Sequence, residues 1–326
     1  MKRVIIVVPE GPVNANTIGG AFDILSKAND YWKSQGNASR LELSVAGFVR
    51  ELRSHNGYLA ILPTDITAIK RADMVMIPAL LGDYERTIEK NAALIEWIRK
   101  RYKAGAEIAS MCSGAFLLAA TGLLDGQSCS VHWNRLELFQ QLFPQVNAQA
   151  GKIITAANGI YTNGGAYSFL HLVLYLVEQL FDRTTAIFCA KIFQIDLERS
   201  SQSPFSIFET QKEHDDELVV RAQTYIEENI DERISFEKLA TQLAVSRRNF
   251  DRRFTKATGN TPVEYLQRVK VEAAKKELEN GRKTILEIML DVGYNDNKAF
   301  REVFKRITGL SPLEYRNKYS KENALA

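Results

Sequence analysis

The first two hundred residues alternate short apolar runs with longer amphipathic stretches. Residues 3–8 form an almost continuous run of β-branched side chains, which predicts a strand buried on both of its faces. The same pattern predicts further strands over 41–49 and 74–78 and helices over 17–34 and 87–102. Strands that alternate with helices are typical of a doubly wound α/β domain, and we expect this fold over residues 1–200.

The last third of the chain has a different pattern and contains an internal repeat. Residues 258–265 (TGNTPVEY) match residues 308–315 (TGLSPLEY), and the same offset pairs Phe250 with Phe300. Two copies of one unit are too few for a stable solenoid. The helical periodicity of each copy instead predicts a tandem pair of helix-turn-helix units in an all-α domain.

Each copy predicts two short helices joined by a tight turn. The first unit spans about 235–258, with its turn at Ala244-Val245, and the second unit spans about 284–308. The phenylalanines of each second helix are spaced i, i+4 and should face the core. A longer helix over 263–280 is expected to connect the two units.

The second helix of each unit carries the chemistry that double-stranded DNA requires. A helix in the major groove needs hydrogen-bond donors for base edges and cations for phosphates. We therefore predict DNA contacts from Ser246, Arg247, Arg248, Asn249, Arg252 and Arg253 in the first unit and from Asn295, Asp296, Asn297, Lys298 and Arg301 in the second. A solvated helix face is the alternative for any single residue, and the sequence does not separate base contacts from phosphate contacts.

Residues 217–326 resemble an AraC-type DNA-binding domain. The signature that carries the resemblance consists of Gly293, Tyr294, Asp296, Phe300, Phe304, Lys305, Gly309, Pro312 and Tyr315. The resemblance implies seven helices and two recognition helices that read adjacent major-groove segments, about 10 base pairs apart.

Cys112 lies where an expected strand leads directly into a helix rich in small residues. The helix N-terminus should lower the pKa of this thiol and could hold an anion. His132 follows one αβ unit later and could approach Cys112 as a base. The alternative is that Cys112 is a small buried residue and His132 a structural one.

Residues 1–200 resemble the DJ-1/PfpI superfamily, whose fold is that of class I glutamine amidotransferases, in the GlxA-like branch that is fused to AraC domains. The resemblance rests on residues 109–119, on 122–126, on His132-Trp133 and on 162–165. It implies a pocket formed by Cys112, Ser113, Gly114, His132, Gly164 and Gly165.

One departure from the superfamily pattern argues against catalysis. Active members place an acidic residue after the first strand, whereas this chain reads Asn14-Ala15-Asn16-Thr17 there. Without this acid the cysteine lacks its usual partner for activation. We therefore expect no catalytic residue, with Cys112 and His132 belonging to a vestigial site or a ligand pocket, and neither a metal site nor a cofactor.

Composition adds little beyond this picture. A chain of 326 residues with 45% hydrophobic and 25% charged residues is long enough for two globular domains. Apolar runs stay well short of the roughly 20 residues that span a bilayer, and the three cysteines form neither a disulfide framework nor a metal motif. We expect a cytoplasmic protein with no membrane association, in which residues 201–216 form the interdomain linker.

These expectations combine into a sequence-specific transcription regulator that is controlled by an unknown small-molecule effector and forms a homodimer through its N-terminal domain. Two alternatives remain, namely a DJ-1/PfpI-type cysteine hydrolase or deglycase and a thiol redox sensor, both acting through Cys112.

Overall fold

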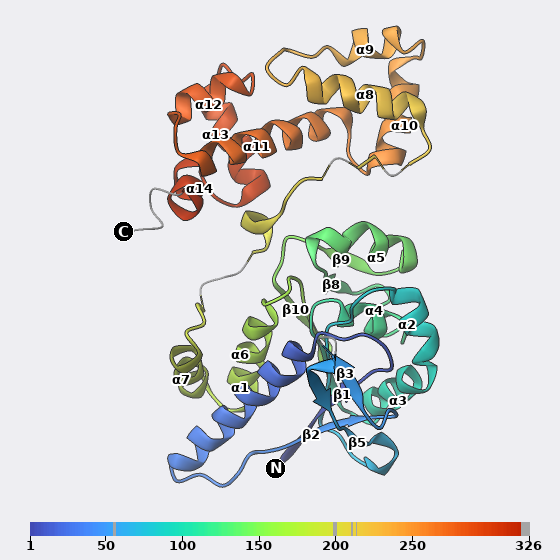
Figure 1. The fold of residues 1–326 in the computed structure, drawn as a ribbon, viewed down its shortest axis with the longest axis vertical. Helices are drawn as coiled ribbons and strands as arrows, with labels where there is room; N and C mark the ends of the chain where they lie inside the picture. The colour runs from blue at the N-terminus through green and yellow to red at the C-terminus, as the bar shows by residue number, and fades with distance from the viewer. Residues whose placement is uncertain (55–56, 198–200, 210, 213, 321–326) are drawn as a thin grey trace. The chain divides into compact units, whose positions relative to one another are not determined.

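The computed structural model describes residues 1–54, 57–197, 201–209, 211–212 and 214–320, and it divides the chain into two compact units. Unit 1 comprises residues 1–202 and unit 2 comprises residues 203–326 (Figure 1). Residues 210 and 213 of the expected linker, and residues 321–326 of the expected DNA-binding domain, lie outside the described residues. Within the part that is described, no helix is both long and apolar enough to cross a membrane.

Unit 1 is built on a seven-stranded sheet with the order β10-β11-β7-β6-β1-β2-β5. Its strands run parallel except β10, which pairs antiparallel with β11. Their bounds are β1 (Lys2–Val8), β2 (Leu41–Gly47), β5 (Thr64–Asp65), β6 (Met74–Ile77), β7 (Glu107–Ser110), β10 (Ile154–Ala157) and β11 (Ile160–Asn163). Two small sheets pair β3 (Leu52–Ser54) with β4 (Leu59–Ile61) and β8 (Ser128–Ser130) with β9 (Asn147–Gln149).

Helices cover both faces of this sheet, as expected for a doubly wound α/β fold (Figure 1). One face carries α1 (Ala15–Ser34), α6 (Phe169–Leu180) and α7 (Arg183–Phe193), and the other carries α2 (Tyr84–Lys90), α3 (Ala92–Lys103) and α4 (Gly114–Ala119). The short α5 (Leu136–Leu142) follows β8. Strand β1 lies between β2 and β6 and buries Val4 to Val8, which explains its unbroken apolar run.

The single helix expected over 87–102 is wrong, because the structure has two helices there. Helix α2 ends and α3 begins at Asn91, whose backbone leaves the helical conformation. The Asn91 side chain accepts the backbone N–H of Glu10 (2.8 Å) and donates to the Glu10 carbonyl (2.7 Å). A tertiary contact to a distant loop therefore breaks a segment whose periodicity is continuous.

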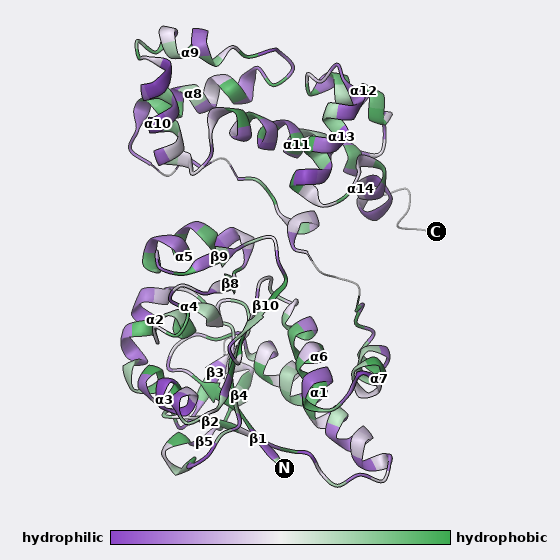
Figure 2. Cartoon of the chain, turned by 180° about the vertical axis from the view of Figure 1, so that it is seen from behind, coloured by the Kyte–Doolittle hydropathy of each residue, from purple (hydrophilic) through white to green (hydrophobic). Residues whose placement is uncertain are grey.

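Unit 2 contains seven α-helices among its described residues, the number of helices that the AraC-type resemblance implies. They are α8 (Glu217–Glu228), α9 (Phe236–Gln242), α10 (Arg247–Thr258), α11 (Pro262–Asn280), α12 (Ile285–Asp291), α13 (Asn297–Thr308) and α14 (Pro312–Tyr319). In Figure 2 these helices carry both hydrophilic and hydrophobic colours, as amphipathic helices should.

The repeat in the sequence appears as two separate hydrophobic cores with the same aromatic arrangement. Phe250 and Phe254 of α10 pack with Tyr265 of α11 in the first core. The second core contains the equivalent residues Phe300, Phe304 and Tyr315. Helix α11 contributes to both cores, with its first half in one and its second half in the other.

Residues 203–209, at the start of unit 2, pack against α11 and α14 of the same unit. The Tyr319 hydroxyl donates to the carbonyl of Pro204 (3.0 Å), and the Lys275 ammonium donates to the carbonyl of Ser206 (2.6 Å). Gln202, just before this segment, is fully buried in unit 1, where its side-chain amide donates to the carbonyls of Val131 (3.0 Å) and Lys152 (2.8 Å). Gln202 is the last residue of unit 1, and Ser203 is the first residue of unit 2.

The turns of the two helix-turn-helix units share one backbone motif. After α9 the N–H groups of Ala244 and Val245 donate to the carbonyls of Thr241 and Ala240, and the second unit repeats both hydrogen bonds one copy later. This pattern is the Schellman motif, which requires a left-handed residue. The second unit uses Gly293 (φ 69°) at this place, whereas the first unit uses Ala244 (φ 56°), a side chain that this region disfavours.

The strained alanine predicts that Ala244→Gly stabilises unit 2 by about 0.5–1 kcal/mol, since glycine adopts this conformation without a Cβ clash. Gly293→Ala should destabilise it instead, because a Cβ there would lie 2.5 Å from the carbonyl oxygen of Asp231. Thermal unfolding followed by far-UV circular dichroism measures both effects. Tryptophan fluorescence is the control, because all three tryptophans lie in unit 1. An unchanged or lower midpoint for Ala244→Gly would contradict the assignment of strain.

Candidate functional site

The second helix of each helix-turn-helix unit begins at a side-chain N-cap. The Ser246 hydroxyl accepts the backbone N–H of Asn249 (3.3 Å), and Asp296 accepts the backbone N–H of Lys298 (2.8 Å). Each cap satisfies a free N–H at the helix start. Because Phe250, Phe254 and their counterparts in α13 are buried, the remaining faces of both helices carry the polar residues.

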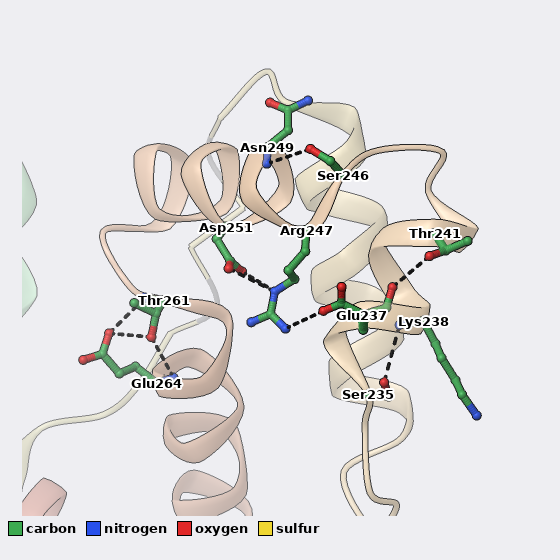
Figure 3. A network of polar contacts seen from close by, with 10 residues as sticks. All are labelled: Ser235, Glu237, Lys238, Thr241, Ser246, Arg247, Asn249, Asp251, Thr261 and Glu264. Atoms are coloured by element: carbon green, nitrogen blue, oxygen red, sulfur yellow. Dashed lines mark hydrogen bonds and ion pairs between the residues drawn. The ribbon is translucent and has the colours of Figure 1, made fainter.

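Arg247 is engaged by acidic and aromatic neighbours (Figure 3). Its Nε donates to both carboxylate oxygens of Asp251 (2.8 and 3.0 Å), Glu237 lies 3.7 Å from its Nη1, and its guanidinium stacks over Phe236. Figure 3 shows Arg247 pointing toward α9 while Asn249 points away from it. The arginine therefore links the two helices of the first unit.

Arg253 also has an acidic partner within unit 2. Its guanidinium makes two hydrogen bonds to the carboxylate of Asp216, at 2.8 and 2.5 Å. Asp216 caps α8 as well by accepting the N–H of Val219 (3.2 Å). The hydrogen bonds from Arg253 hold the pKa of the Asp216 carboxyl below its usual value. This pair joins α10 to the start of α8.

The other predicted cations are exposed. Arg248 and Arg252 are one turn apart on α10, and Arg252 donates to the side chain of Asn249 (3.0 Å). On α13 Lys298 and Arg301 are exposed, as are Asn295, Asp296 and Asn297 around the helix start. The same surfaces hold three further exposed cations that the prediction of DNA contacts omits, namely Lys256, Lys305 and Arg306. Their helical spacing from Arg252 and Arg301 is the signal that could have included them.

In unit 1, Cys112 and His132 line the same cavity, which has a volume of about 160 Å³. Cys112 lies between β7 and α4 with a left-handed backbone (φ 51°), and its N–H donates to the side chain of Asn163 (3.0 Å). The cavity is lined by Asn14, Ala79, Leu80, Leu81, Tyr84, Cys112, Ser113, Phe116, Val131, His132, Asn134, Arg135 and Ala166.

The three glycines expected in this pocket, Gly114, Gly164 and Gly165, are not among the described residues that line the cavity. A Cβ on Gly114 would lie 2.7 Å from the carbonyl oxygen of Pro78, so only glycine lets α4 approach β6 this closely. Gly164 packs against Gln202 in the same way, and the N–H of Gly165 is hydrogen-bonded to Cys112. They shape the pocket through the backbone.

The expectation of a depressed Cys112 pKa is wrong. Burial raises the pKa of this thiol above its ordinary value and outweighs the hydrogen bonds from Ser113 and Gly165 and the charge of Arg135, which act in the other direction. Burial also lowers the pKa of His132, and Arg135 adds to that effect. The pair is therefore a neutral thiol and a neutral imidazole at neutral pH.

None of the described residues that line the cavity is acidic, in agreement with the sequence of the loop after β1. Glu10 of that loop lies 3.7 Å from Lys90 instead. The described residues contain no cluster of three or more His, Cys, Asp and Glu side chains that could hold a metal ion.

Comparisons with known protein families match both units. A helix-turn-helix domain model matches residues 239–318, and the DJ-1/PfpI family model matches residues 36–179. The chain therefore consists of a DJ-1/PfpI domain followed by an AraC-type helix-turn-helix domain. This helix-turn-helix type is a DNA-binding module.

Similar proteins are named as helix-turn-helix transcriptional regulators. The chain is 25% identical over 227 residues to the HTH-type transcriptional regulator GbdR of Pseudomonas aeruginosa, which covers 68% of this chain and 60% of that protein. It is also 25% identical over 229 residues to the HTH-type transcriptional regulator GlxA of Rhizobium meliloti, with 68% of both chains covered. The chain thus matches about 60% of the length of the first of these relatives.

A solved structure supports the fold of unit 1. Drosophila melanogaster DJ-1beta aligns with 60% of this chain and 98% of its own, at 18% identity and a TM-score of 0.50. At this identity the likeness establishes the fold alone.

The Arg253–Asp216 pair predicts a pH-dependent contribution to the stability of unit 2. A lowered carboxyl pKa stabilises the fold above the unfolded value of about 3.9, and this contribution is lost as the pH falls through the folded pKa. Asp216→Asn keeps the α8 cap and removes the charge, so it should cost about 1 kcal/mol at pH 7.

Urea unfolding of both proteins between pH 7 and pH 3, followed by circular dichroism, measures the difference. The gap between wild type and Asp216→Asn should close at the acid end. A gap that stays constant across this range would show that the charge of Asp216 contributes nothing. Asp251→Asn is the control for an exposed i, i+4 pair and should cost only about 0.3–0.5 kcal/mol.

Proposed function

We propose that this protein is a transcription regulator that binds specific sites in double-stranded DNA through α10 and α13. The observation that carries the proposal is the duplicated helix-turn-helix unit, in which both second helices present exposed cations and amides on the side opposite their buried phenylalanines. One such face could be a solvated surface. Two equivalent faces at equivalent positions of a repeat match the requirement for reading two groove segments.

The contacts within unit 2 favour a division of labour among the arginines. We assign DNA contact to Arg248, Asn249 and Arg252 of α10, because these side chains are not paired with a carboxylate in the described structure. Arg253 has the role of fixing α10 against the start of α8 through Asp216. Arg247 is paired with Asp251 of its own helix and contacts α9 through Glu237 and Phe236. Free guanidinium groups can bind guanine edges or phosphates in two-point fashion.

In the second unit we assign DNA contact to Asn297, Lys298 and Arg301 of α13. Ser246 and Asp296 have their side-chain oxygens occupied as N-caps and fix the starts of the two recognition helices. Asn295 precedes the cap and can reach the DNA backbone. Lys256, Lys305 and Arg306 supply further positive charge for phosphates.

Unit 1 has the properties of a ligand sensor rather than of an enzyme. Its cavity combines a strained, buried cysteine with a raised pKa and a neutral histidine, and its described lining offers no acid to activate either group. The raised pKa also disfavours a thiol redox sensor, which needs thiolate character. Hydrolase or deglycase turnover that disappears in Cys112→Ser would contradict this view.

Gln202, the last residue of unit 1, contacts the wall of this cavity. Gln202 is hydrogen-bonded to the carbonyl of Val131, which lines the cavity, and the next residues are fixed on α11 and α14. We propose that an effector bound in this cavity changes the affinity of the protein for DNA. Control of this kind requires that the effector bind two states of the protein with different affinity.

We also propose a homodimer through unit 1. Phe22 of α1 and Ile192 and Phe193 of α7 are partly exposed and line an open groove, beside Asp23 and Lys27. Apolar side chains next to charges of both signs suit a self-complementary surface. Sedimentation of a monomer at micromolar concentration would contradict it.

The assignment of recognition residues predicts which substitutions weaken DNA binding. Arg248→Gln and Arg301→Gln should each cost about 1–3 kcal/mol of binding and relax specificity at one position if they contact bases. A phosphate contact should instead weaken all sequences alike and lower the salt slope by about 1. Fluorescence anisotropy with the selected site and a scrambled site, over a range of salt concentrations, separates the two cases.

Arg221→Gln is the matched control, because Arg221 is exposed on α8, outside both recognition helices. It should leave affinity nearly unchanged. Equal losses from all three variants, or none from the recognition-helix variants, would contradict the proposed interface.

A further inference from the structure

The described lining of the cavity beside Cys112 contains one positive charge and no negative charge. Arg135 is the single charged residue among the described lining residues, so the lining carries a formal charge of +1. The amides of Asn14 and Asn134 add N–H donors, and no carboxylate is present to balance the guanidinium.

His132 adds a further donor through its tautomer. Its Nδ1 accepts the backbone N–H of Asn134 at 3.3 Å, which leaves the proton of the neutral ring on Nε2. Burial lowers the pKa of His132 and keeps the ring neutral at neutral pH. The Nε2–H is then available to an acceptor.

The rest of the wall is apolar and the space is small. Leu80, Leu81, Phe116 and Val131 line the cavity, with Tyr84 stacked on Phe116 at 4.1 Å between ring centres. The volume of about 160 Å³ accommodates a molecule of roughly six to ten non-hydrogen atoms. Such a site selects ligands that have one charged end and a short apolar body.

We propose that this cavity binds a small monocarboxylate, with its carboxylate at Arg135 and the Nε2–H of His132 and its hydrocarbon part against Leu80, Phe116 and Val131. This inference rests on the proposed sensor role of unit 1 and names the chemical class of its effector. Arginine is well suited to the two oxygens of a carboxylate, and charge-assisted hydrogen bonds are the strongest polar contacts available here. A phosphate dianion fits less well, because one guanidinium leaves half of its charge unbalanced.

The test uses the full-length protein and a matched set of probes. Straight-chain monocarboxylates from acetate to octanoate and benzoate are compared with butyramide, which has the shape of butyrate without its charge, and with inorganic phosphate. Saturation-transfer NMR and calorimetric titration give the dissociation constants. Butyrate, or the best carboxylate of the series, should bind at least about tenfold more tightly than its amide.

Arg135→Gln should abolish this preference, while Arg71→Gln, an exposed arginine of unit 1 outside the cavity, should preserve it. Equal binding of carboxylate and amide, a preference that survives Arg135→Gln, tighter binding of phosphate, or no binding by any carboxylate would each overturn the proposal. Unfolding midpoints of both variants establish that they are folded.

The DNA-binding proposal is measured separately, so that the two failures can be told apart. If carboxylates bind and leave the affinity for DNA unchanged, the ligand class stands and the sensor role fails. If the affinity for DNA is intact and carboxylates do not bind, the regulator stands and the ligand class is wrong.

Discussion

The spacing between the two recognition helices depends on one helix, α11. Its first half closes the first aromatic core through Tyr265, and its second half supplies Val271, Ala274 and Leu278 to the second core. Between the two halves the buried Lys270 donates to the carbonyl of Gly293 (3.2 Å), which lies in the turn of the second unit. A continuous α-helix rises about 1.5 Å per residue, so its length sets the distance between the two cores. Helix α11 therefore holds α10 and α13 at fixed positions along its length.

This constraint explains why the arginines divide into two groups. A recognition helix that reads base edges must be held rigidly, and polar groups that do so are unavailable for DNA. On α10 Arg247 is paired with Asp251 of the same helix, and Arg253 is paired with Asp216 at the start of α8. Arg248 and Arg252 have no carboxylate partner among the described residues. In the proposed interface, the same helix therefore contains two arginines that position it within unit 2 and two that contact DNA.

In unit 1 the corresponding constraint is the turn at Cys112. A left-handed backbone at a cysteine is held in place because Gly114 packs α4 against the carbonyls of β6. Burial raises the pKa of the Cys112 thiol, and none of the described residues that line the cavity is acidic. A cavity with this wall and one guanidinium is suited to holding a ligand.

Much of the fold and part of the candidate site could be predicted from the sequence. The duplication of the Thr-Gly-x-x-Pro-x-x-Tyr segment predicts two equivalent units, and both cores confirm it. The pairing of Arg247 with Asp251 was accessible through its i, i+4 spacing. The pairing of Arg253 with Asp216, 37 residues away, was not, because only the tertiary fold brings them together. The prediction of a lowered Cys112 pKa was wrong because burial, which raises this pKa, also depends on the tertiary fold and is not visible in a sequence motif.

The claim that both units read DNA at a spacing set by α11 can be tested on the DNA itself. Selection of genomic fragments by the full-length protein should enrich a site with two short blocks about one helical turn, or roughly 10 base pairs, apart. Insertion of about 5 base pairs between the blocks rotates them to opposite faces and should reduce binding to the level of a single block. Recovery of no discrete site, or full affinity for the lengthened site, would contradict the account.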